Sequence, residues 1–217
     1  MLISHKHKFL TIDIQKTATR SLRQTLFDQR PRPVDFVGKP TCDMGLSQHG
    51  TIENAQNGFR EMGWNIDEYF KFTVVRNPWA RWYSLFNWMK SRAELAHHPN
   101  FNDFELPKQQ HVTIMKNFFN SVTSDIEAFK SIIHSHRAQH EYYTIDDKIA
   151  VDHIALFENL EAEFKLLCDK TNIKHTPLKW KNKSTYATSM YDFYTEELVE
   201  MVREKEAYTI ALKGYEF

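Results

Sequence analysis

The chain has 217 residues, of which 41% are hydrophobic and 26% are charged, and its 28 Lys and Arg side chains balance 28 Asp and Glu. This composition suits a globular protein with a buried core, and six glycines and seven prolines exclude collagen-like and low-complexity chains. Two cysteines, Cys42 and Cys168, are too few for a disulfide framework or a four-cysteine zinc site. No apolar stretch approaches the roughly 20 residues that cross a bilayer. We expect a soluble, cytoplasmic protein with a single domain over residues 1–217.

Strands and helices are expected to alternate along the chain. Runs of β-branched and aromatic residues predict strands at 8–14, 69–75 and 151–157. Helical periodicity, with capping residues and prolines at the boundaries, predicts helices at 21–29, 51–62, 78–92, 110–121, 124–136, 158–171 and 195–212. Thr51 is the expected N-cap of the second helix, and Pro78 suits the first turn of the third. Residues 30–48 are expected to form a loop and residues 93–109 an exposed insertion.

This alternation predicts an α/β fold of three layers, a parallel sheet flanked by helices on both faces. In such sheets ligands bind beyond the carboxyl ends of the strands. The turns that follow the strands at 8–14 and 69–75 are therefore the places where a ligand site is expected. Both turns are basic.

Positive charge is concentrated in three segments although the net charge is zero. Residues 1–40, 71–92 and 171–187 together hold seventeen basic and three acidic side chains, so the rest of the chain is acidic. A fold that gathers these segments would surround an anion. The alternative is that each segment is a solvated basic face.

The first basic turn lies between a strand and a helix and contains Lys16 beside several hydroxyl side chains. Backbone N–H groups at a helix N-terminus favour an anion, and a lysine beside them makes a phosphate cradle. The turn is not a Walker A loop, because Leu10 and Gln15 stand where that pattern needs glycines. An ordinary capped helix start is the alternative at this point.

The second basic turn follows the strand at 69–75. Arg76 stands directly at the end of that strand, where its guanidinium group can bind a phosphate with two hydrogen bonds. Ser84 follows eight residues later, about two helical turns along, on a face that can return toward the same ligand. The alternative for Arg76 is an ion pair with a nearby carboxylate.

Together the two turns resemble the nucleotide-binding segments of the sulfotransferase family. Phe9 to Leu22 is similar to the strand–PKTG/AT–helix segment that grips the 5′-phosphosulfate, and Phe70 to Lys90 to the FKFxxVRNPWxRxxSxY segment that binds the 3′-phosphate. Gln139 to Leu160 and residues 182–217 resemble two further segments, close to the carbohydrate sulfotransferase branch. The resemblance runs in order over nearly the whole chain.

The resemblance implies a P-loop-like nucleotide-binding fold and metal-free sulfuryl transfer from 3′-phosphoadenosine-5′-phosphosulfate (PAPS). The acceptor would be a hydroxyl or amine of a small molecule, such as a carbohydrate, with no nucleic acid or membrane as partner. Lys16 matches the catalytic lysine at the 5′-phosphate, while Arg76 and Ser84 match ligands of the 3′-phosphate. Lys183 is a further candidate. The expected cofactor-binding loop is Lys16, Thr17, Ala18, Thr19, Arg20 and Ser21.

Some residues depart from the family pattern. Gln15 replaces the usual proline before the lysine, Thr19 and Arg20 replace the small residues of the loop, and Phe157 replaces an arginine. Arg20 either adds a phosphate contact or crowds the loop. An inactive relative that binds the cofactor therefore stays open as an alternative.

The acceptor needs a base, and His49 lies where related enzymes often place a histidine. An imidazole with a pKa near 6.5 suits proton abstraction at neutral pH. Glu53, four residues on, is either the rival base or the group that orients His49. The alternative for His49 is an ordinary loop residue.

Other readings are disfavoured. His134, His136 and His140 do not have the spacing of an ordinary zinc motif, so no metal site is expected. A nucleotide-dependent kinase is disfavoured because the Walker A glycines are missing and no carboxylate placed to hold Mg²⁺ follows the basic turns. A noncatalytic polyanion-binding module that uses the basic segments is the remaining alternative; steep salt dependence would mark it.

Overall fold

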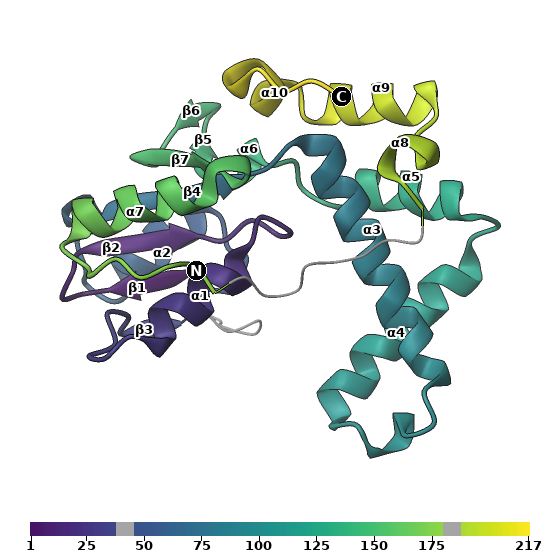
Figure 1. Cartoon of the computed structure of the whole chain (residues 1–217), viewed down its shortest axis with the longest axis horizontal. Helices are drawn as coiled ribbons and strands as arrows, with labels where there is room; N and C mark the ends of the chain where they lie inside the picture. The colour runs from purple at the N-terminus through teal and green to yellow at the C-terminus, as the bar shows by residue number, and fades with distance from the viewer. Residues whose placement is uncertain (38–45, 180–187) are drawn as a thin grey trace. The chain divides into compact units, whose positions relative to one another are not determined.

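The computed structural model describes residues 1–37, 46–179 and 188–217, so the predicted site residue Lys183 lies outside the described residues (Figure 1). The chain divides into two compact units. The first comprises Met1–Asn77, Ala138–Thr185 and Tyr208–Glu216, and the second comprises Pro78–Arg137, Tyr186–Ala207 and Phe217. The boundary at Asn77 falls directly after the turn that carries Arg76.

The first unit is built on a five-stranded sheet with the order β3-β1-β2-β4-β7. Its strands are β1 (Leu2–Ser4), β2 (Phe9–Ile12), β3 (Phe36–Val37), β4 (Phe70–Val75) and β7 (His153–Leu156). The pairs β2–β4 and β4–β7 are parallel, whereas β1 is antiparallel to both β2 and β3. The prediction of a parallel sheet is therefore correct for its centre and wrong at one edge.

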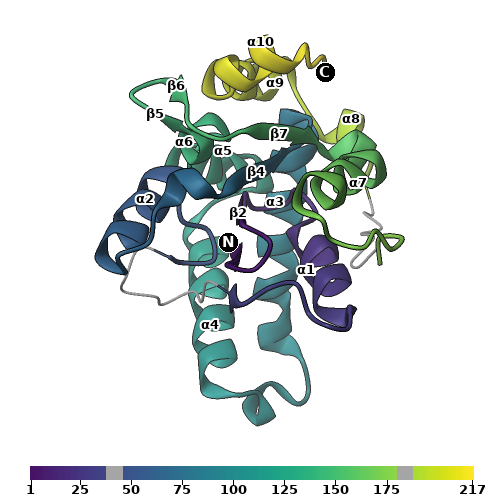
Figure 2. The ribbon, with the colours of Figure 1, turned by 90° about the vertical axis from the view of Figure 1, so that its left-hand side faces the viewer.

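Helices cover both faces of this sheet. Figure 2 shows α2 (Ile52–Glu61) on one side and α1 (Thr19–Asp28) with α7 (Leu160–Thr171) on the other. The unit also contains α6 (His140–Tyr143), most of α10 (Ala207–Lys213), the 3₁₀ turns η1 (Ile66–Glu68) and η4 (Phe157–Asn159), and the hairpin β5 (Thr144–Ile145) and β6 (Lys148–Ile149). The expected layering of helix, sheet and helix is present in this unit.

Two hydrophobic clusters fill the spaces between the layers. On β2, Leu10 and Ile12 face the α2 side, where Phe59 packs, while Phe9 faces the opposite side with Leu26 of α1. Successive side chains of a strand point to opposite faces, so each strand contributes to both clusters. Strands buried on both faces are rich in apolar residues, which is why the sequence predicts the strand at 69–75 that becomes β4.

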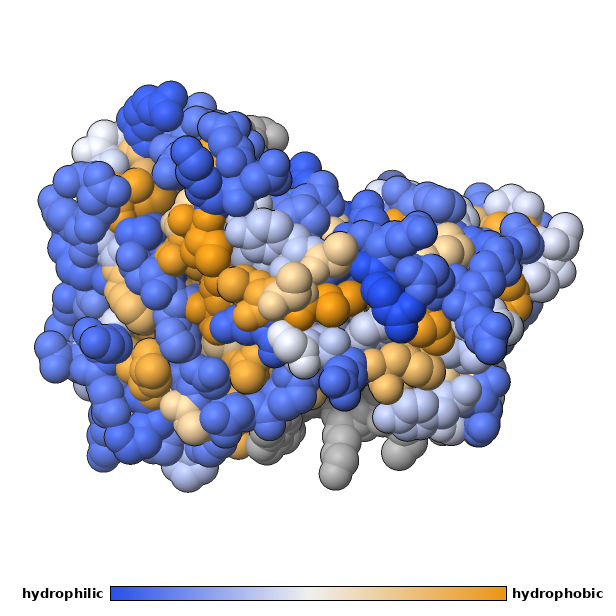
Figure 3. Space-filling view, turned by 90° about the horizontal axis from the view of Figure 1, so that it is seen from above, coloured by the Kyte–Doolittle hydropathy of each residue, from blue (hydrophilic) through white to orange (hydrophobic). Residues whose placement is uncertain are grey.

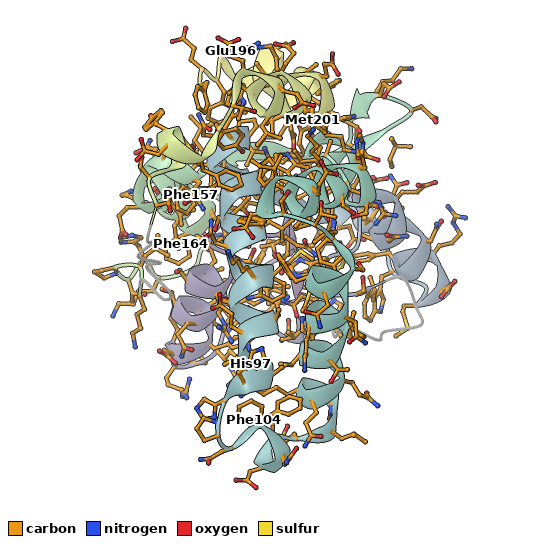
Figure 4. The ribbon with its side chains drawn as sticks, turned by 90° about the vertical axis from the view of Figure 1, so that its right-hand side faces the viewer. His97, Phe104, Phe157, Phe164, Glu196 and Met201 are labelled. Atoms are coloured by element: carbon orange, nitrogen blue, oxygen red, sulfur yellow. The ribbon has the colours of Figure 1, made fainter. Side chains whose placement is uncertain are left out.

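The second unit is helical. It contains α3 (Pro78–Glu94), α4 (Leu106–Ser121), α5 (Asp125–Ser135), α8 (Met190–Phe193) and α9 (Glu196–Lys205), with 3₁₀ turns η2 (Leu95–His97) and η3 (Phe101–Asp103). Figure 4 shows His97 and Phe104 at the end of the α3–α4 pair where the chain turns back. The predicted insertion at 93–109 thus coincides with the connection between two antiparallel helices.

A buried ion pair joins two helical segments of the second unit. Nη2 of Arg81 on α3 lies 2.8 Å from Oε1 of Glu206, and both side chains are at most 1% exposed. The same carboxylate oxygen accepts a hydrogen bond of 3.0 Å from Nε1 of Trp82. Trp79 donates in addition to the carbonyl of Val199 on α9. The basic and aromatic residues of this part of α3 therefore hold α9 and the residue that ends it, Glu206.

Most predicted helices are confirmed within a few residues, and the last one is wrong in part. The expected helix at 195–212 is divided at Glu206 into α9 and α10. Glu206 has backbone angles outside the helical region and places its carboxylate in the ion pair with Arg81. The apolar periodicity continues through this break, so the sequence pattern alone predicts one helix.

The described surface exposes a few large hydrophobic side chains, among them Leu106 and Ile114 on α4 and Tyr191 on α8. Figure 3 shows one face on which hydrophobic residues form patches among hydrophilic ones. Scattered exposed apolar side chains are normal for a folded protein. Within the described residues, no helix has the length and apolar character that crossing a membrane requires.

Candidate functional site

The two basic turns of the first unit lie side by side at one edge of the sheet. Strand β2 pairs with β4 in parallel, with Ile12 opposite Thr73. Oγ1 of Thr73 donates a hydrogen bond of 2.8 Å to the carbonyl of Ile12, which reinforces the pairing near the strand ends. Because parallel strands end at the same edge, the loop after β2 and the turn after β4 are neighbours there.

The loop after β2 is tightly closed on itself. The hydroxyl groups of Thr17 and Thr19 donate hydrogen bonds of 2.9 and 3.1 Å to the carbonyl of Ile14. Lys16 and Ala18 have φ values of 69° and 61°, in the left-handed region that non-glycine residues rarely adopt. Successive N–H groups in such alternating conformations form a concave anion-binding nest.

Helix α1 begins directly from this loop. Ala18 occupies the N-cap position without a side-chain cap, and no acidic residue stands in the first turn. The first N–H groups of a helix have no partner inside it, and the helix dipole favours negative charge there. Arg20, exposed in this first turn, adds positive charge. Ser21 is buried, at 1% exposure, and its backbone N–H binds the Ala18 carbonyl.

Arg76 reaches the first loop from the end of β4. Its Nη1 donates a hydrogen bond of 3.3 Å to the backbone carbonyl of Lys16. One face of its guanidinium group stacks on the Phe157 ring, 4.4 Å from the centroid. Phe157 lies on η4, seven residues before Phe164 of α7, which is buried in the core (both are labelled in Figure 4). The residue that replaces the family's arginine therefore contacts Arg76 itself.

The turn after Arg76 is held by residues that are distant in sequence. The backbone N–H of Asn77 donates to Oε1 of Glu158 at 2.7 Å, and its side-chain amide donates to the carbonyl of Glu216. The hydroxyl of Tyr215 donates to Oε2 of Glu158 at 3.0 Å. Burial, and then the neighbouring Glu158 carboxylate, raise the pKa of Tyr215 above its usual value, so this phenol stays protonated.

His49 is held in a defined tautomer by a contact just beyond the end of β2. Its Nδ1 lies 2.7 Å from the backbone carbonyl of Asp13, just beyond the end of β2. A carbonyl oxygen only accepts, so Nδ1 carries the proton and Nε2 keeps its lone pair. Burial lowers the pKa of His49 below its usual value, so the imidazole is neutral at pH 7. The ring is therefore prepared to accept a proton at Nε2.

The residue that orients His49 is part of a buried charge cluster. The Asp13 carboxylate lies 2.7 Å from Nη2 of Arg23 and 2.9 Å from the amino group of Met1, and it accepts a hydrogen bond from Thr11. Burial by itself raises the pKa of Asp13, but the two positive groups outweigh it and hold the pKa below its usual value. The cluster fixes the backbone on which His49 depends.

The other predicted residues are placed differently. Glu53 is exposed in the first turn of α2, and no hydrogen bond or ion pair joins it to His49 in the part of the chain that the structure describes. Ser84 is 3% exposed on α3, in the second unit. Thr51 caps α2 as expected, with a capping box shared with Asn54. The described ranges contain no group of three His, Cys, Asp or Glu side chains that could hold a metal ion.

Comparison with known proteins decides the family. A family model described as "Sulfotransferase family" matches residues 1–211. The chain belongs to the sulfotransferase family. No curated protein and no solved structure matches it. The membership makes this protein a transferase of sulfuryl groups, and the match spans the loop of Lys16, the turn of Arg76 and most of the second unit.

Three residues around the site of this sulfotransferase had no predicted role in it: Asp13, Gln139 and Phe157. Asp13 contributes a backbone carbonyl, which no side-chain pattern reveals. Gln139 and Phe157 stand in the third resembling segment, far along the chain, and only the β4–β7 pairing brings that segment to Arg76. Apart from the family resemblance, no local signal marks Gln139, which stands among polar residues such as Arg137, His140 and Glu141.

Proposed function

We propose that this sulfotransferase transfers the sulfuryl group of PAPS to a hydroxyl or amine of a small acceptor, such as a carbohydrate. The observation that carries the proposal is the Arg76–Lys16 contact, which joins the two basic turns at adjacent strand ends. Two clustered cationic groups suit a nucleotide with phosphates at both the 5′ and 3′ positions. The family match over residues 1–211 supports one functional domain that includes both units.

The donor is held chiefly by the first unit in this proposal. The loop from Lys16 to Ser21 binds the 5′-phosphosulfate through N–H groups that precede Ser21, since the Ser21 N–H is bonded to the Ala18 carbonyl, and Lys16 neutralises charge on the leaving phosphate. Arg76 binds the 3′-phosphate. The hydroxyls of Thr17 and Thr19 already donate to Ile14, so their structural role is to shape the loop while their backbone amides face the ligand. Ser84 and Lys183 are proposed as further ligands from the family resemblance alone.

His49 is the proposed general base. As the acceptor oxygen or nitrogen attacks sulfur, a new bond to sulfur forms and the bond from sulfur to the bridging phosphate oxygen breaks. The electron pair of the broken bond passes to the 5′-phosphate beside Lys16, and the proton of the acceptor passes to Nε2 of His49. The reaction parallels phosphoryl transfer, in which the protein contributes mainly positioning and charge stabilisation.

The experiment that tests this function is a screen of hydroxylated and amino acceptors with PAPS labelled with ³⁵S at the sulfuryl group and the purified protein. The expected result is label on at least one acceptor class, with adenosine 3′,5′-bisphosphate formed in equal amount. Transfer of the γ-phosphoryl group of ATP to an acceptor, in place of sulfuryl transfer from PAPS, would support a kinase. Retention of PAPS without transfer to any acceptor would support an inactive relative. Binding of polyanions with steep salt dependence and no preference for PAPS would support a polyanion-binding module.

A further inference from the structure

The side chain of Gln139 forms two hydrogen bonds with the backbone of a single residue, Arg76. Its Oε1 accepts from the Arg76 N–H at 2.9 Å, and its Nε2 donates to the Arg76 carbonyl at 2.9 Å. Gln139 is fully buried, at 0% exposure, and lies immediately before α6 in the same unit. A buried amide that satisfies both backbone groups of another residue acts as a one-residue strand partner.

These contacts lie just beyond the end of β4, where strand pairing no longer fixes the backbone. The parallel pairing of β4 with β7 ends at Val75 opposite Leu156, so Arg76 is the first residue beyond the ladder. Asn77 and Pro78 follow, and Pro78 has no N–H to contribute. Gln139 therefore fixes the backbone from which the Arg76 side chain departs, at the point where the chain leaves the strand.

The far end of the same side chain is also held. The guanidinium group stacks on Phe157 and donates to the Lys16 carbonyl, as described above. Arg76 is thus fixed at its backbone by Gln139 and at its head by two other contacts. A long arginine side chain that is ordered before binding loses less conformational entropy when it captures an anion.

We propose that Gln139 is the positioning residue that presets Arg76 for the 3′-phosphate and so sets the preference for a 3′,5′-bisphosphate nucleotide. This inference rests on the proposed function, because it assumes that Arg76 binds that phosphate. Gln139 acts through Arg76 and does not touch the nucleotide. Its effect is therefore confined to ligands that carry a 3′-phosphate.

The test compares adenosine 3′,5′-bisphosphate with adenosine 5′-monophosphate by calorimetry, in the full chain and in three variants. Gln139→Met keeps the length and loses both hydrogen bonds. Gln139→Glu is nearly isosteric and keeps an acceptor for the Arg76 N–H while losing the donor. Thr171→Val is the matched control, because it removes a buried hydrogen bond to Leu167 at the end of α7. Urea unfolding of each variant reports its folding.

We expect both Gln139 variants to bind the bisphosphate about tenfold or more weakly, since each loses a buried hydrogen bond that orients Arg76. Their affinity for the monophosphate, and both affinities of Thr171→Val, should stay within about twofold of the unmodified chain. An equal loss for both nucleotides would show a merely structural role and overturn the inference. An unchanged preference for the bisphosphate in folded Gln139→Glu would overturn it as well.

Failure of the proposed function gives a different result. If the unmodified chain binds the bisphosphate no more tightly than the monophosphate, the 3′-phosphate site itself is contradicted, and with it the role of Gln139. If the unmodified chain prefers the bisphosphate and both Gln139 variants keep that preference, only the inference about Gln139 fails.

Discussion

Nη1 of Arg76 lies 3.3 Å from the backbone carbonyl of Lys16, so the end of β4 is bonded to the loop that follows β2. The carbonyl of Lys16 and the N–H of Thr17 belong to one planar peptide and point in opposite directions. When Arg76 holds the carbonyl, it also directs the Thr17 N–H away from itself. Arg76 therefore has two roles in the account: it shapes the phosphate loop and supplies a cation of its own.

Replacement of Arg76 should abolish the preference for a 3′-phosphate. Arg76→Ala removes the charged partner of that phosphate, and we expect a loss of about 2–5 kcal/mol in binding of adenosine 3′,5′-bisphosphate, by analogy with broken buried charge pairs. Arg76→Lys keeps the charge but loses the two-pronged geometry, so an intermediate loss is expected. Calorimetry measures both, with Arg60→Ala, an exposed arginine on α2, as the control. Equal affinity in Arg76→Ala and the unmodified chain removes Arg76 from the site.

Ala18 should be less favourable than glycine at its own position. Its φ of 61° costs an L-residue about 1–2 kcal/mol, whereas glycine adopts this conformation freely. Glycine is also more flexible in the unfolded chain, which offsets about 0.4–1 kcal/mol of that gain. We therefore expect Ala18→Gly to raise the free energy of unfolding by about 0.5–1 kcal/mol, as measured by urea denaturation.

The control for that prediction is a glycine in an ordinary helical position. Ala162 is exposed inside α7, and Ala162→Gly should lower the free energy of unfolding by about 1 kcal/mol. Opposite signs for the two substitutions would show that the loop holds Ala18 in a strained conformation. A loss of stability in Ala18→Gly as large as that in Ala162→Gly would show that it does not.

The pH dependence of turnover should report the neutral form of His49. Burial lowers its pKa, and a general base works only when unprotonated. The rate should therefore rise as pH increases through the His49 pKa, with a midpoint below about 6.5, and be flat above it. Titration of the imidazole by NMR measures the same pKa without an acceptor. A midpoint above 6.5 would contradict the burial of this ring.

Substitution separates His49 from Glu53 as the base. His49→Ala should lower turnover by about 10²–10⁴-fold while leaving nucleotide affinity nearly unchanged, because the base contacts the acceptor. Glu53→Gln should have little effect, since Glu53 is exposed and the Asp13 carbonyl already orients the imidazole. Near-normal turnover in His49→Ala together with a collapse in Glu53→Gln would transfer the role to Glu53.

The buried pair of Arg81 and Glu206 should matter for stability as a unit. Removal of one partner leaves the other charge buried, so Arg81→Met and Glu206→Gln should each lower the free energy of unfolding by about 3–5 kcal/mol. The double variant should lose less than the two single losses combined, and chemical denaturation of all four proteins gives the coupling energy. Strict additivity would show that the two charges do not depend on each other.

Transfer should not require a divalent metal. Lys16 and Arg76 supply the positive charge that Mg²⁺ supplies in kinases. The rate of label transfer from PAPS should be the same in EDTA and in added Mg²⁺. Activity that disappears in EDTA and returns with Mg²⁺ or Zn²⁺ would contradict this account and favour a kinase-like or metal-dependent reaction.

The central strands and the two basic turns were predictable because each depends on local sequence. β4 is rich in aromatic and β-branched residues, Pro78 stands at the start of α3, and the hydroxyl-rich turn after β2 precedes a helix. The antiparallel edge was missed because β1 and β3 have only three and two residues. Strands that short carry no periodicity, and their pairing, of β1 with β2 and of β3 with β1, determines them rather than propensity.

The groups that orient the site could not be predicted in the same way. Lys16 and Arg76 were named from their positions after strands, but their contact depends on the register of β2 and β4. Gln139 and Phe157, which contact Arg76, belong to a third segment that lies beyond residues 78–137 of the helical unit in the chain and comes to the site through the β4–β7 pairing. The carbonyl that fixes His49 belongs to the backbone. Such contacts follow from topology, which local pattern does not contain.

The most direct test of the account is a crystal structure of the protein with adenosine 3′,5′-bisphosphate. The account predicts the 5′-phosphate on the backbone N–H groups of the loop from Lys16 to Arg20, with the Lys16 ammonium beside it, and the 3′-phosphate within hydrogen-bond distance of the Arg76 guanidinium. A nucleotide bound elsewhere, or one whose 3′-phosphate lies away from Arg76, would contradict the account.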